Sequence, residues 1–348
     1  MTYNEKTQYQ CALLSSRLVK RFKVLQKWAK RVGAGVYRLY SRDIPEIPLV
    51  LDYYIGEEQN SSYVCGALFK RPYYKSAEEE GAWILAMSSA ISTAVNVPLE
   101  NIFIKIRQTL HTKKEMAYNG ESAYQYCKTE GTKKIIVKEG ILRYELELCS
   151  YIDAGLFPDL RKARAFIKEN AAGKSVLNLF CYTGSFSVNA ASGGACKIDS
   201  VDMSATYLKT AEKNFALNSF KNSKYSFIRA DVIRFLDDAV QKKQKWDIII
   251  LDPPVFSASK KMQGNALGGT MDILRDFNFL MAKCLKLLNK GGLLLFSTHA
   301  KSFKLNEAEF VQTYSALYPA LSIKNRTEMF RDEDFRKHRV PAVYVVHL

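Results

Sequence analysis

The sequence lacks several features that would assign the chain to other classes of protein. No apolar run approaches the roughly 18 residues of a membrane-spanning helix. The first ten residues, MTYNEKTQYQ, lack the apolar core of a signal peptide. We therefore expect a cytoplasmic protein that has no membrane partner.

Cysteine and histidine are few and scattered. The cysteines number seven, an odd count with no C-x-x-C pair, and only four histidines occur in 348 residues. This usage favours reduced thiols over disulfides and offers no zinc-binding pattern. We predict that the chain holds no metal.

The chain also lacks the G-x-G-x-x-G turn that a dinucleotide site needs to bring backbone close to a pyrophosphate. The corresponding stretch, which begins at Asn178, reads NLFCYTGSF and holds a single glycine, Gly184. One tight-turn glycine suits a ligand without a pyrophosphate, such as S-adenosylmethionine. The sequence therefore favours a nucleoside-containing cofactor over a dinucleotide.

The stretch from Asn178 to Pro254 alternates short apolar runs with helical patterns. Such alternation predicts an α/β fold with a doubly wound, mostly parallel sheet. Four apolar runs end near polar residues, which are Asn178, Asp202, Asp231 and Asp252. Because ligands bind beyond the carboxyl ends of the strands in such sheets, we expect these four side chains to converge on one ligand.

Two of these carboxylates have specific candidate roles. Asp202 can accept hydrogen bonds from both ribose hydroxyls of a nucleoside; the alternative is a helix cap, but Ser204 is available for that role. Asp231 can accept the adenine amino group, with the backbone of Val232 beside it. Helix capping is the alternative for Asp231 also.

The sequence DPPVF (Asp252–Phe256) is the most specific motif. Its two prolines fix the backbone and remove two N–H donors, which predicts a rigid wall beside a planar base. Enzymes that methylate amino groups usually have an aromatic residue directly after the prolines, whereas here Val255 precedes Phe256. Cytosine-C5 chemistry needs a cysteine nucleophile, and both Cys181 and Cys284 are poorly placed for one.

Positive charge is the strongest compositional signal, because the formal net charge is +16. The first 50 residues hold ten Lys or Arg against three acids, and a helical pattern from Leu14 ends near Gly33. Its outer face is either a solvated surface or a contact to nucleic-acid phosphates. The candidate phosphate contacts are Arg17, Lys20, Arg21, Lys27 and Arg31, with Lys113 and Lys114 in a polar loop.

Several motifs together carry a resemblance to a known family. They are NLFCYTGSFS, SVDMSATYLKTAEKNFALN, ADVIRFL, DIIILDPPVFSASKKM and GGLLLFSTHAKSF, with RLVKRFKVLQKWAKRVGAGVYRLY, YIDAGLFPDLRKAR and DFRKHRV outside that core. The chain resembles the class I S-adenosylmethionine-dependent methyltransferases of large-subunit ribosomal RNA. It is most similar to the guanine-N7 methyltransferase half of a bifunctional bacterial 23S ribosomal RNA enzyme.

The resemblance implies a Rossmann-like class I methyltransferase domain over 151–348 and a smaller α+β, RNA-binding domain over 1–150. It implies that Asp159 and Arg161 close over the amino-acid end of S-adenosylmethionine. The remaining cofactor residues would be Asn178, Phe180, Tyr182, Gly184, Asp202, Met203, Asp231 and Val232. The base pocket would be formed by Asp252, Pro253, Pro254 and Phe256.

We predict transfer of a methyl group from S-adenosylmethionine to a base of 23S ribosomal RNA, free or in a pre-ribosomal particle. Guanine N7 is the favoured target, because its lone pair can attack a methyl group without prior removal of a proton. Two alternatives remain open: a cytosine-C5 methyltransferase of the same family, and an RNA-binding assembly factor without catalytic activity.

Overall fold

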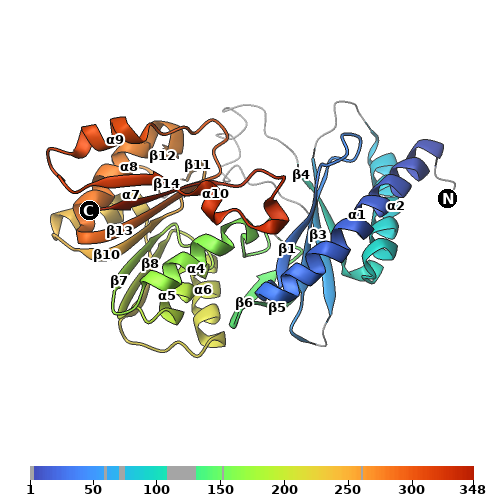
Figure 1. Cartoon of the computed structure of the whole chain (residues 1–348), viewed down its shortest axis with the longest axis horizontal. Coiled ribbons are helices and arrows are strands. Elements are labelled where there is room, and N and C mark those ends of the chain that lie inside the picture. Colours follow the sequence, from blue (N-terminus) through green and yellow to red (C-terminus); the bar gives the residue numbers. More distant parts are fainter. Residues whose placement is uncertain (1–3, 59–60, 70–74, 108–130, 151–152, 260–261) are drawn as a thin grey trace. The chain divides into compact units, whose positions relative to one another are not determined.

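A computed structural model describes residues 4–58, 61–69, 75–107, 131–150, 153–259 and 262–348. Its contacts divide the chain into two compact units. Unit 1 takes the described residues of Met1–Leu110, Tyr124–Pro158 and Glu333–His338, and unit 2 takes those of Asp159–Asp332 and Arg339–Leu348. The two units are described separately below, with their elements labelled in Figure 1.

Unit 1 is built on a four-stranded sheet in the order β1-β2-β3-β4, formed by β1 (Val36–Ser41), β2 (Leu49–Ile55), β3 (Ser62–Phe69) and β4 (Ile102–Arg107). The first three strands pair antiparallel, but β4 pairs parallel to β3. The sheet of unit 1 is therefore mixed, with one parallel pair at this strand. Helix α2 (Ala77–Val95) lies between β3 and β4 in the sequence and supplies the crossover that a parallel pair requires.

Two helices complete the core of unit 1. Helix α1 (Glu5–Val32) begins at an Asn4 cap and ends at Gly33, whose φ of 68° is left-handed, so it starts nine residues before the predicted apolar pattern. A hydrogen bond holds the first turns of α1 against α2: Gln10 Oε1 accepts from the indole N–H of Trp83 at 2.7 Å. The apolar side of α1 packs inward, with Leu14 and Leu18 fully buried.

A hairpin and a distant segment also belong to unit 1. The hairpin consists of β5 (Lys134–Glu139) and β6 (Leu142–Glu147). The segment Glu333–His338 comes from the far end of the sequence, and its Asp334 and Phe335 are fully buried. The domain boundary expected at residue 150 assigns this segment to the second domain, whereas the contacts of the structure assign it to unit 1.

Unit 2 contains a seven-stranded sheet in the order β14-β15-β13-β10-β7-β8-β9. The strands β7, β8, β9, β10 and β13 run parallel, whereas β15 is antiparallel to both β13 and β14. Their bounds are Ser175–Leu179 (β7), Lys197–Asp202 (β8), Tyr225–Arg229 (β9), Trp246–Leu251 (β10), Leu288–Thr298 (β13), Ser322–Asn325 (β14) and Ala342–His347 (β15). This arrangement confirms the predicted Rossmann-like α/β class.

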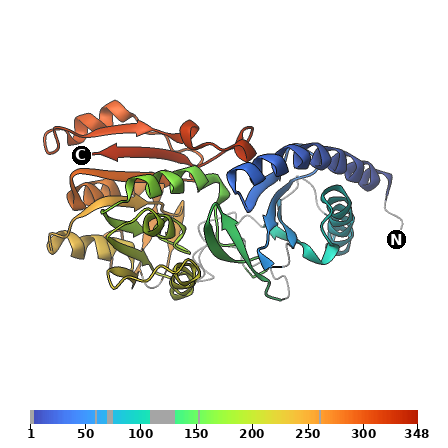
Figure 2. The same ribbon diagram turned by 60° about the horizontal axis from the view of Figure 1, so that its bottom comes forward.

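Helices cover both faces of this sheet (Figures 1 and 2). They are α4 (Arg161–Asn170), α5 (Ser185–Ser192), α6 (Ala205–Leu217), α7 (Val232–Gln241), α8 (Ile273–Leu287), α9 (Glu307–Tyr314) and α10 (Thr327–Phe330). Strand β10 lies between β7 and β13, and its residues Ile248–Leu251 are at most 2% exposed, which explains their uninterrupted apolar run. No helix in the described parts of the chain is long and apolar enough to cross a membrane.

Candidate functional site

The turn after β7 has an unusual backbone. Phe180, Tyr182 and Gly184 have φ angles of 56°, 51° and 74°, a region that residues with a Cβ seldom adopt. Gly184 is required by packing as well, because a Cβ there would lie 2.8 Å from the Cβ of Ala211 on α6. Strained backbone of this kind persists where surrounding structure enforces it, and it is concentrated at ligand sites.

Asp202 is the residue that fixes this turn. It ends β8, and its Oδ2 accepts a hydrogen bond from the backbone N–H of Tyr182 at 3.0 Å, while Oδ1 accepts one from Ser204 at 2.8 Å. Ser204 caps α6 through its own hydroxyl, as the sequence indicated, so Asp202 is not the cap. Burial raises the pKa of Asp202 even though these hydrogen bonds act in the opposite direction. A ligand with hydrogen-bond donors or positive charge would compensate that burial.

Asn178 lies inside β7 and not at its tip, which corrects the sequence-based placement. The strand continues to Leu179 because the register with β8 and β10 includes that residue. The amide nitrogen of Asn178 donates to the hydroxyl of Ser187 at 2.9 Å. Its Oδ1 is buried and has no hydrogen-bond partner among the described residues. A ligand donor is the kind of group that such an atom requires.

Asp231 caps helix α7, which is the alternative considered from the sequence. It lies two residues beyond the end of β9, its Oδ1 accepts from the backbone of Ile233, and its Oδ2 accepts from the side chain of Asn265 at 2.9 Å. Both oxygens are therefore engaged, and a contact with adenine stays a prediction. The neighbouring Val232 is 3% exposed, and Met203 packs against the same core.

Asn265 was not identified from the sequence, although it organises the loop beside Asp231. Its Oδ1 accepts hydrogen bonds from the backbones of Leu267 and Gly269. The only available signal was an asparagine ahead of a glycine pair, in NALGG, and that pattern is common in surface turns.

Asp252 follows β10 directly and belongs to a polar cluster. The hydroxyl of Ser297, on β13, donates to its Oδ1 at 2.6 Å. Burial raises the pKa of Asp252, the charge of His299 and the Ser297 hydrogen bond oppose that shift, and Asp159 adds to it. Asp159 in turn lies with its Oδ2 4.0 Å from Nδ1 of His299, and its Oδ1 is buried without a partner among the described residues.

The two ends of β10 carry carboxylates with opposite electrostatic character. Asp247 lies near the start of the strand. Burial raises its pKa, but hydrogen bonds from Ser175 and Asn289 outweigh that effect and hold the pKa below the usual range. Asp252, after the end of the strand, has a raised pKa. The ionised carboxylate of Asp247 therefore stabilises the fold, whereas the ionised carboxylate of Asp252 lowers the stability of the folded state.

We expect Asp252→Asn to leave the melting temperature at pH 7.5 unchanged or raise it by a few degrees. A native carboxyl with a raised pKa binds more protons than the unfolded chain does, so its contribution to stability falls as pH rises from about 4 to the raised value. The matched variant Asp247→Asn should lower the melting temperature at pH 7.5, with the difference vanishing as pH falls below about 4. Melting curves from about pH 2 to pH 8 measure both effects. A clearly less stable Asp252→Asn at pH 7.5 would contradict the raised pKa of Asp252.

The other predicted site residues have different surroundings. The guanidinium of Arg161 donates to Asp332 at 2.7 Å, an ion pair that the sequence did not reveal, so a grip on a cofactor carboxylate stays a prediction. Pro253 is buried. Phe256 opens β11 (Phe256–Ala258), which pairs with β12 (Thr270–Asp272), and its side chain is partly exposed.

Burial raises the pKa of both thiols considered for nucleophilic chemistry, those of Cys181 and Cys284. Both are therefore protonated at neutral pH, and Cys284 is fully buried in the core of unit 2. Among the described residues, no group of three or more His, Cys, Asp or Glu side chains could hold a metal ion. The absence of a metal stays a prediction.

The predicted RNA contacts on α1 lie in unit 1. Arg17, Lys20, Lys27 and Arg31 are exposed, whereas Arg21 is partly buried and donates to backbone carbonyls. Lys113 and Lys114 lie outside the described residues.

Comparison with known proteins defines the class that this fold and site represent. The family model of S-adenosylmethionine-dependent methyltransferases matches residues 92–313. The chain is also 36% identical, over 94% of its own length, to ribosomal RNA large subunit methyltransferase K of Neisseria meningitidis, and it covers 84% of that protein. The chain therefore belongs to the S-adenosylmethionine-dependent methyltransferases, and S-adenosylmethionine is its cofactor.

Longer relatives match in the same way over part of their length. Ribosomal RNA large subunit methyltransferase K/L of Shewanella loihica is 35% identical over 93% of this chain, which spans only 42% of that protein. Among solved structures, SMU.776, described as a methyltransferase in complex with SAH, aligns with a TM-score of 0.68 over 96% of this chain and 82% of its own, at 22% identity. That likeness supports the fold.

Proposed function

We propose that the chain methylates a base of large-subunit ribosomal RNA, and that the base is guanine with N7 as the acceptor. The substrate class is supported by the Neisseria meningitidis relative, of which this chain covers 84%. That protein is named as a ribosomal RNA large subunit methyltransferase. The basic surface of α1 is consistent with such a substrate, because a net charge of +16 attracts polyanions. The partner is 23S ribosomal RNA or a pre-ribosomal particle, and the location is the cytoplasm.

The residues at the carboxyl edge of the unit 2 sheet fit S-adenosylmethionine. Asp159 and Asn178 each have a buried oxygen without a partner among the described residues, and burial raises the pKa of Asp202. These three acceptors match a ligand that carries an ammonium group, ribose hydroxyls and a positive charge. When bound, the cofactor supplies a methyl group on a positively charged sulfur. The turn residues Phe180, Tyr182 and Gly184, together with Met203, Asp231 and Val232, would line the rest of the nucleoside.

Guanine N7 is the target that requires the fewest catalytic groups from this site. The lone pair on N7 is available without removal of a proton, so the protein's task is to hold the base in line with the methyl group. Positioning of this kind contributes up to about 7–11 kcal/mol in well-oriented systems. Asp252, Pro253 and Pro254 would form the wall of the base pocket, and Phe256 would stack on the unstacked base.

The two alternatives make different demands. Cytosine-C5 methylation requires a thiolate, and burial disfavours the thiolate form at both Cys181 and Cys284. An assembly factor without catalysis would not need carboxylates held at raised pKa values, which are typical of functional sites. We therefore prefer the N7 reaction.

The test is a mass-spectrometric comparison of 23S ribosomal RNA nucleosides from cells with and without this gene, followed by methylation with the purified protein. We expect 7-methylguanosine to disappear at one site and the protein to restore it. Cys181→Ser and Cys284→Ser should each retain activity within about threefold; loss of 5-methylcytidine in the deletion, or loss of activity in both variants, would revive the C5 reaction. No change in any nucleoside, and no heat on titration with S-adenosylmethionine, would favour the assembly factor.

A further inference from the structure

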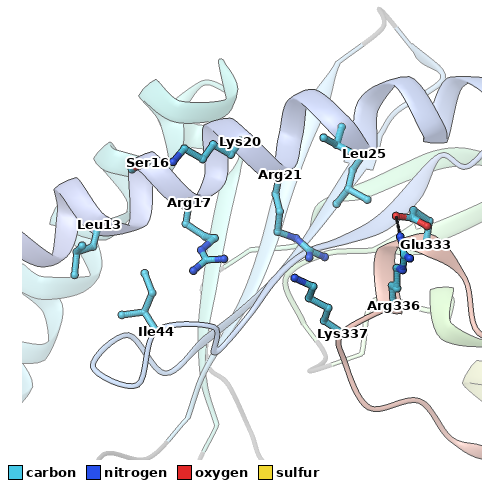
Figure 3. Close-up of a pocket in the computed structure, with 11 residues that line it drawn as sticks. Leu13, Ser16, Arg17, Lys20, Arg21, Leu25, Ile44, Glu333, Arg336 and Lys337 are labelled. Atoms are coloured by element: carbon cyan, nitrogen blue, oxygen red, sulfur yellow. Dashed lines mark ion pairs between the residues drawn. The ribbon is translucent and has the colours of Figure 1, made fainter.

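Unit 1 contains a basic groove between α1 and the segment Glu333–His338 (Figure 3). The groove encloses about 840 Å³, which is in the range of sites that hold ligands of nucleotide size or larger. Five cationic side chains line it, namely Arg17, Lys20, Arg21, Arg336 and Lys337, against one acidic side chain, Glu333. The sequence identified only the three on α1 as candidates, because the other two lie more than 300 residues away.

Three of the cations lack an ion-pair partner among the described residues. Arg17, Lys20 and Lys337 are exposed and make no ion pair with any residue that the structure describes. Arg336 is only loosely paired, with its Nη1 3.8 Å from Glu333 Oε1. In Figure 3, Arg17 and Arg21 point from α1 toward Lys337 on the other wall. Clustered cations of this kind repel one another, and a polyanion in the groove would relieve that repulsion.

Hydrogen bonds hold the two walls together. Arg21 donates from Nε to the carbonyl of Leu39 at 2.8 Å and from Nη2 to that of Asp334 at 2.9 Å. The carboxylate of the fully buried Asp334 accepts the backbone N–H of Arg38 at 2.9 Å. Phe335 is also fully buried and lies under the Arg38 guanidinium. Arg336 and Lys337 follow directly in the sequence and are therefore presented on a fixed backbone.

The lining between the cations is mostly apolar, with Ser16 as a further polar residue. Leu13 and Ile44 are partly buried, Leu25 is 3% exposed, and Val24 is 58% exposed. An apolar surface with cations on both sides matches a nucleic-acid strand, in which charged phosphates alternate with sugars and bases. An acidic protein segment would also need acceptors for its backbone N–H groups, and the groove lining offers chiefly cations, which only donate hydrogen bonds, and aliphatic carbon.

We infer that this groove binds the sugar-phosphate backbone of the ribosomal RNA substrate, with Arg17 and Lys337 contacting phosphates from opposite walls. Arg21 is a positioning residue that fixes the wall carrying Lys337. This inference rests on the proposed function and adds a second contact region in unit 1, remote in sequence from the methyl-transfer site. The sequence DFRKHRV, which begins at Asp334, thereby acquires a role in RNA binding. Composition alone did not indicate that role.

The test compares two double variants that remove the same charge. Arg17→Ala/Lys337→Ala alters the groove, and Lys23→Ala/Lys30→Ala alters exposed positions of α1 that do not line it. Binding of a bacterial 23S ribosomal RNA transcript is measured by filter binding from 50 to 300 mM salt, and S-adenosylmethionine binding by calorimetry. For the groove variant we expect a five- to tenfold higher Kd and a salt slope smaller by about 1.4–1.8, with cofactor affinity unchanged.

The outcomes separate this inference from the proposed function. Equal losses in both double variants would show a general charge effect and overturn the groove while leaving the methyltransferase intact. Loss of binding to ribosomal particles but not to the transcript would indicate a ribosomal protein as the occupant, which also overturns it. If wild-type protein neither binds nor methylates ribosomal RNA, the proposed function fails together with the groove. A melting temperature within about 2 °C of wild type excludes unfolding as the cause.

Discussion

Asp202→Ala is expected to raise the Kd for S-adenosylmethionine by about ten- to hundredfold. A hydrogen bond to a charged acceptor contributes about 1.5–3 kcal/mol, and the proposed site uses this carboxylate for the ribose hydroxyls. The same substitution releases the backbone N–H groups of Tyr182 and Ser204, so the strained turn after β7 loses its support as well. Calorimetric titration at pH 7.5 measures the effect.

Asp199→Asn is the matched control for Asp202. Asp199 lies on the same strand and is 5% exposed, but it accepts a hydrogen bond from the indole of Trp246 at 2.7 Å, and a side-chain amide oxygen can replace it there. We expect its Kd for the cofactor to stay within about twofold of wild type. Wild-type affinity should also fall as pH is lowered through the raised pKa of Asp202, because the protonated acid is a weaker acceptor. An unchanged Kd in Asp202→Ala would remove the carboxylate from the cofactor site.

Phe256→Ala should lower kcat/KM for ribosomal RNA by about ten- to hundredfold, since stacking of a base on an aromatic ring contributes about 1–3 kcal/mol. The affinity for S-adenosylmethionine should be unchanged, because the proposed contact is with the target base. Single-turnover methylation of the transcript, with cofactor at saturation, measures this difference.

Phe256→Tyr keeps the ring and serves as the matched control, with activity expected within about threefold of wild type. Substitutions at position 256 also affect the short β11–β12 pair, so melting curves must accompany the kinetics. Equal losses in the Ala and Tyr variants would mean that the backbone of this pair, and not stacking, supports the reaction. Activity near wild type in the Ala variant would place the base elsewhere.

Much of unit 2 could be predicted because its information is local. Buried parallel strands appear as uninterrupted apolar runs, and WDIIIL before Asp252 coincides with β10. The capping role of Ser204 could also be predicted, because a hydroxyl at the start of a helix is a short-range feature of the sequence. The position of Asn178 was misjudged by one residue, because only pairing with neighbouring strands determines that β7 ends at Leu179.

The sequence alone determined the α/β class, the order of the strand-end carboxylates and the concentration of positive charge near the N-terminus, because periodicity, spacing and composition are properties of the chain itself. Only the tertiary structure decided that β4 pairs parallel to β3, that Asp231 is a cap held by Asn265, and that Asp252 shares a cluster with Asp159 and His299. It also brought Lys337 opposite Arg17 across one groove. These are contacts between residues far apart in sequence, and burial and register, which exist only after folding, determine them.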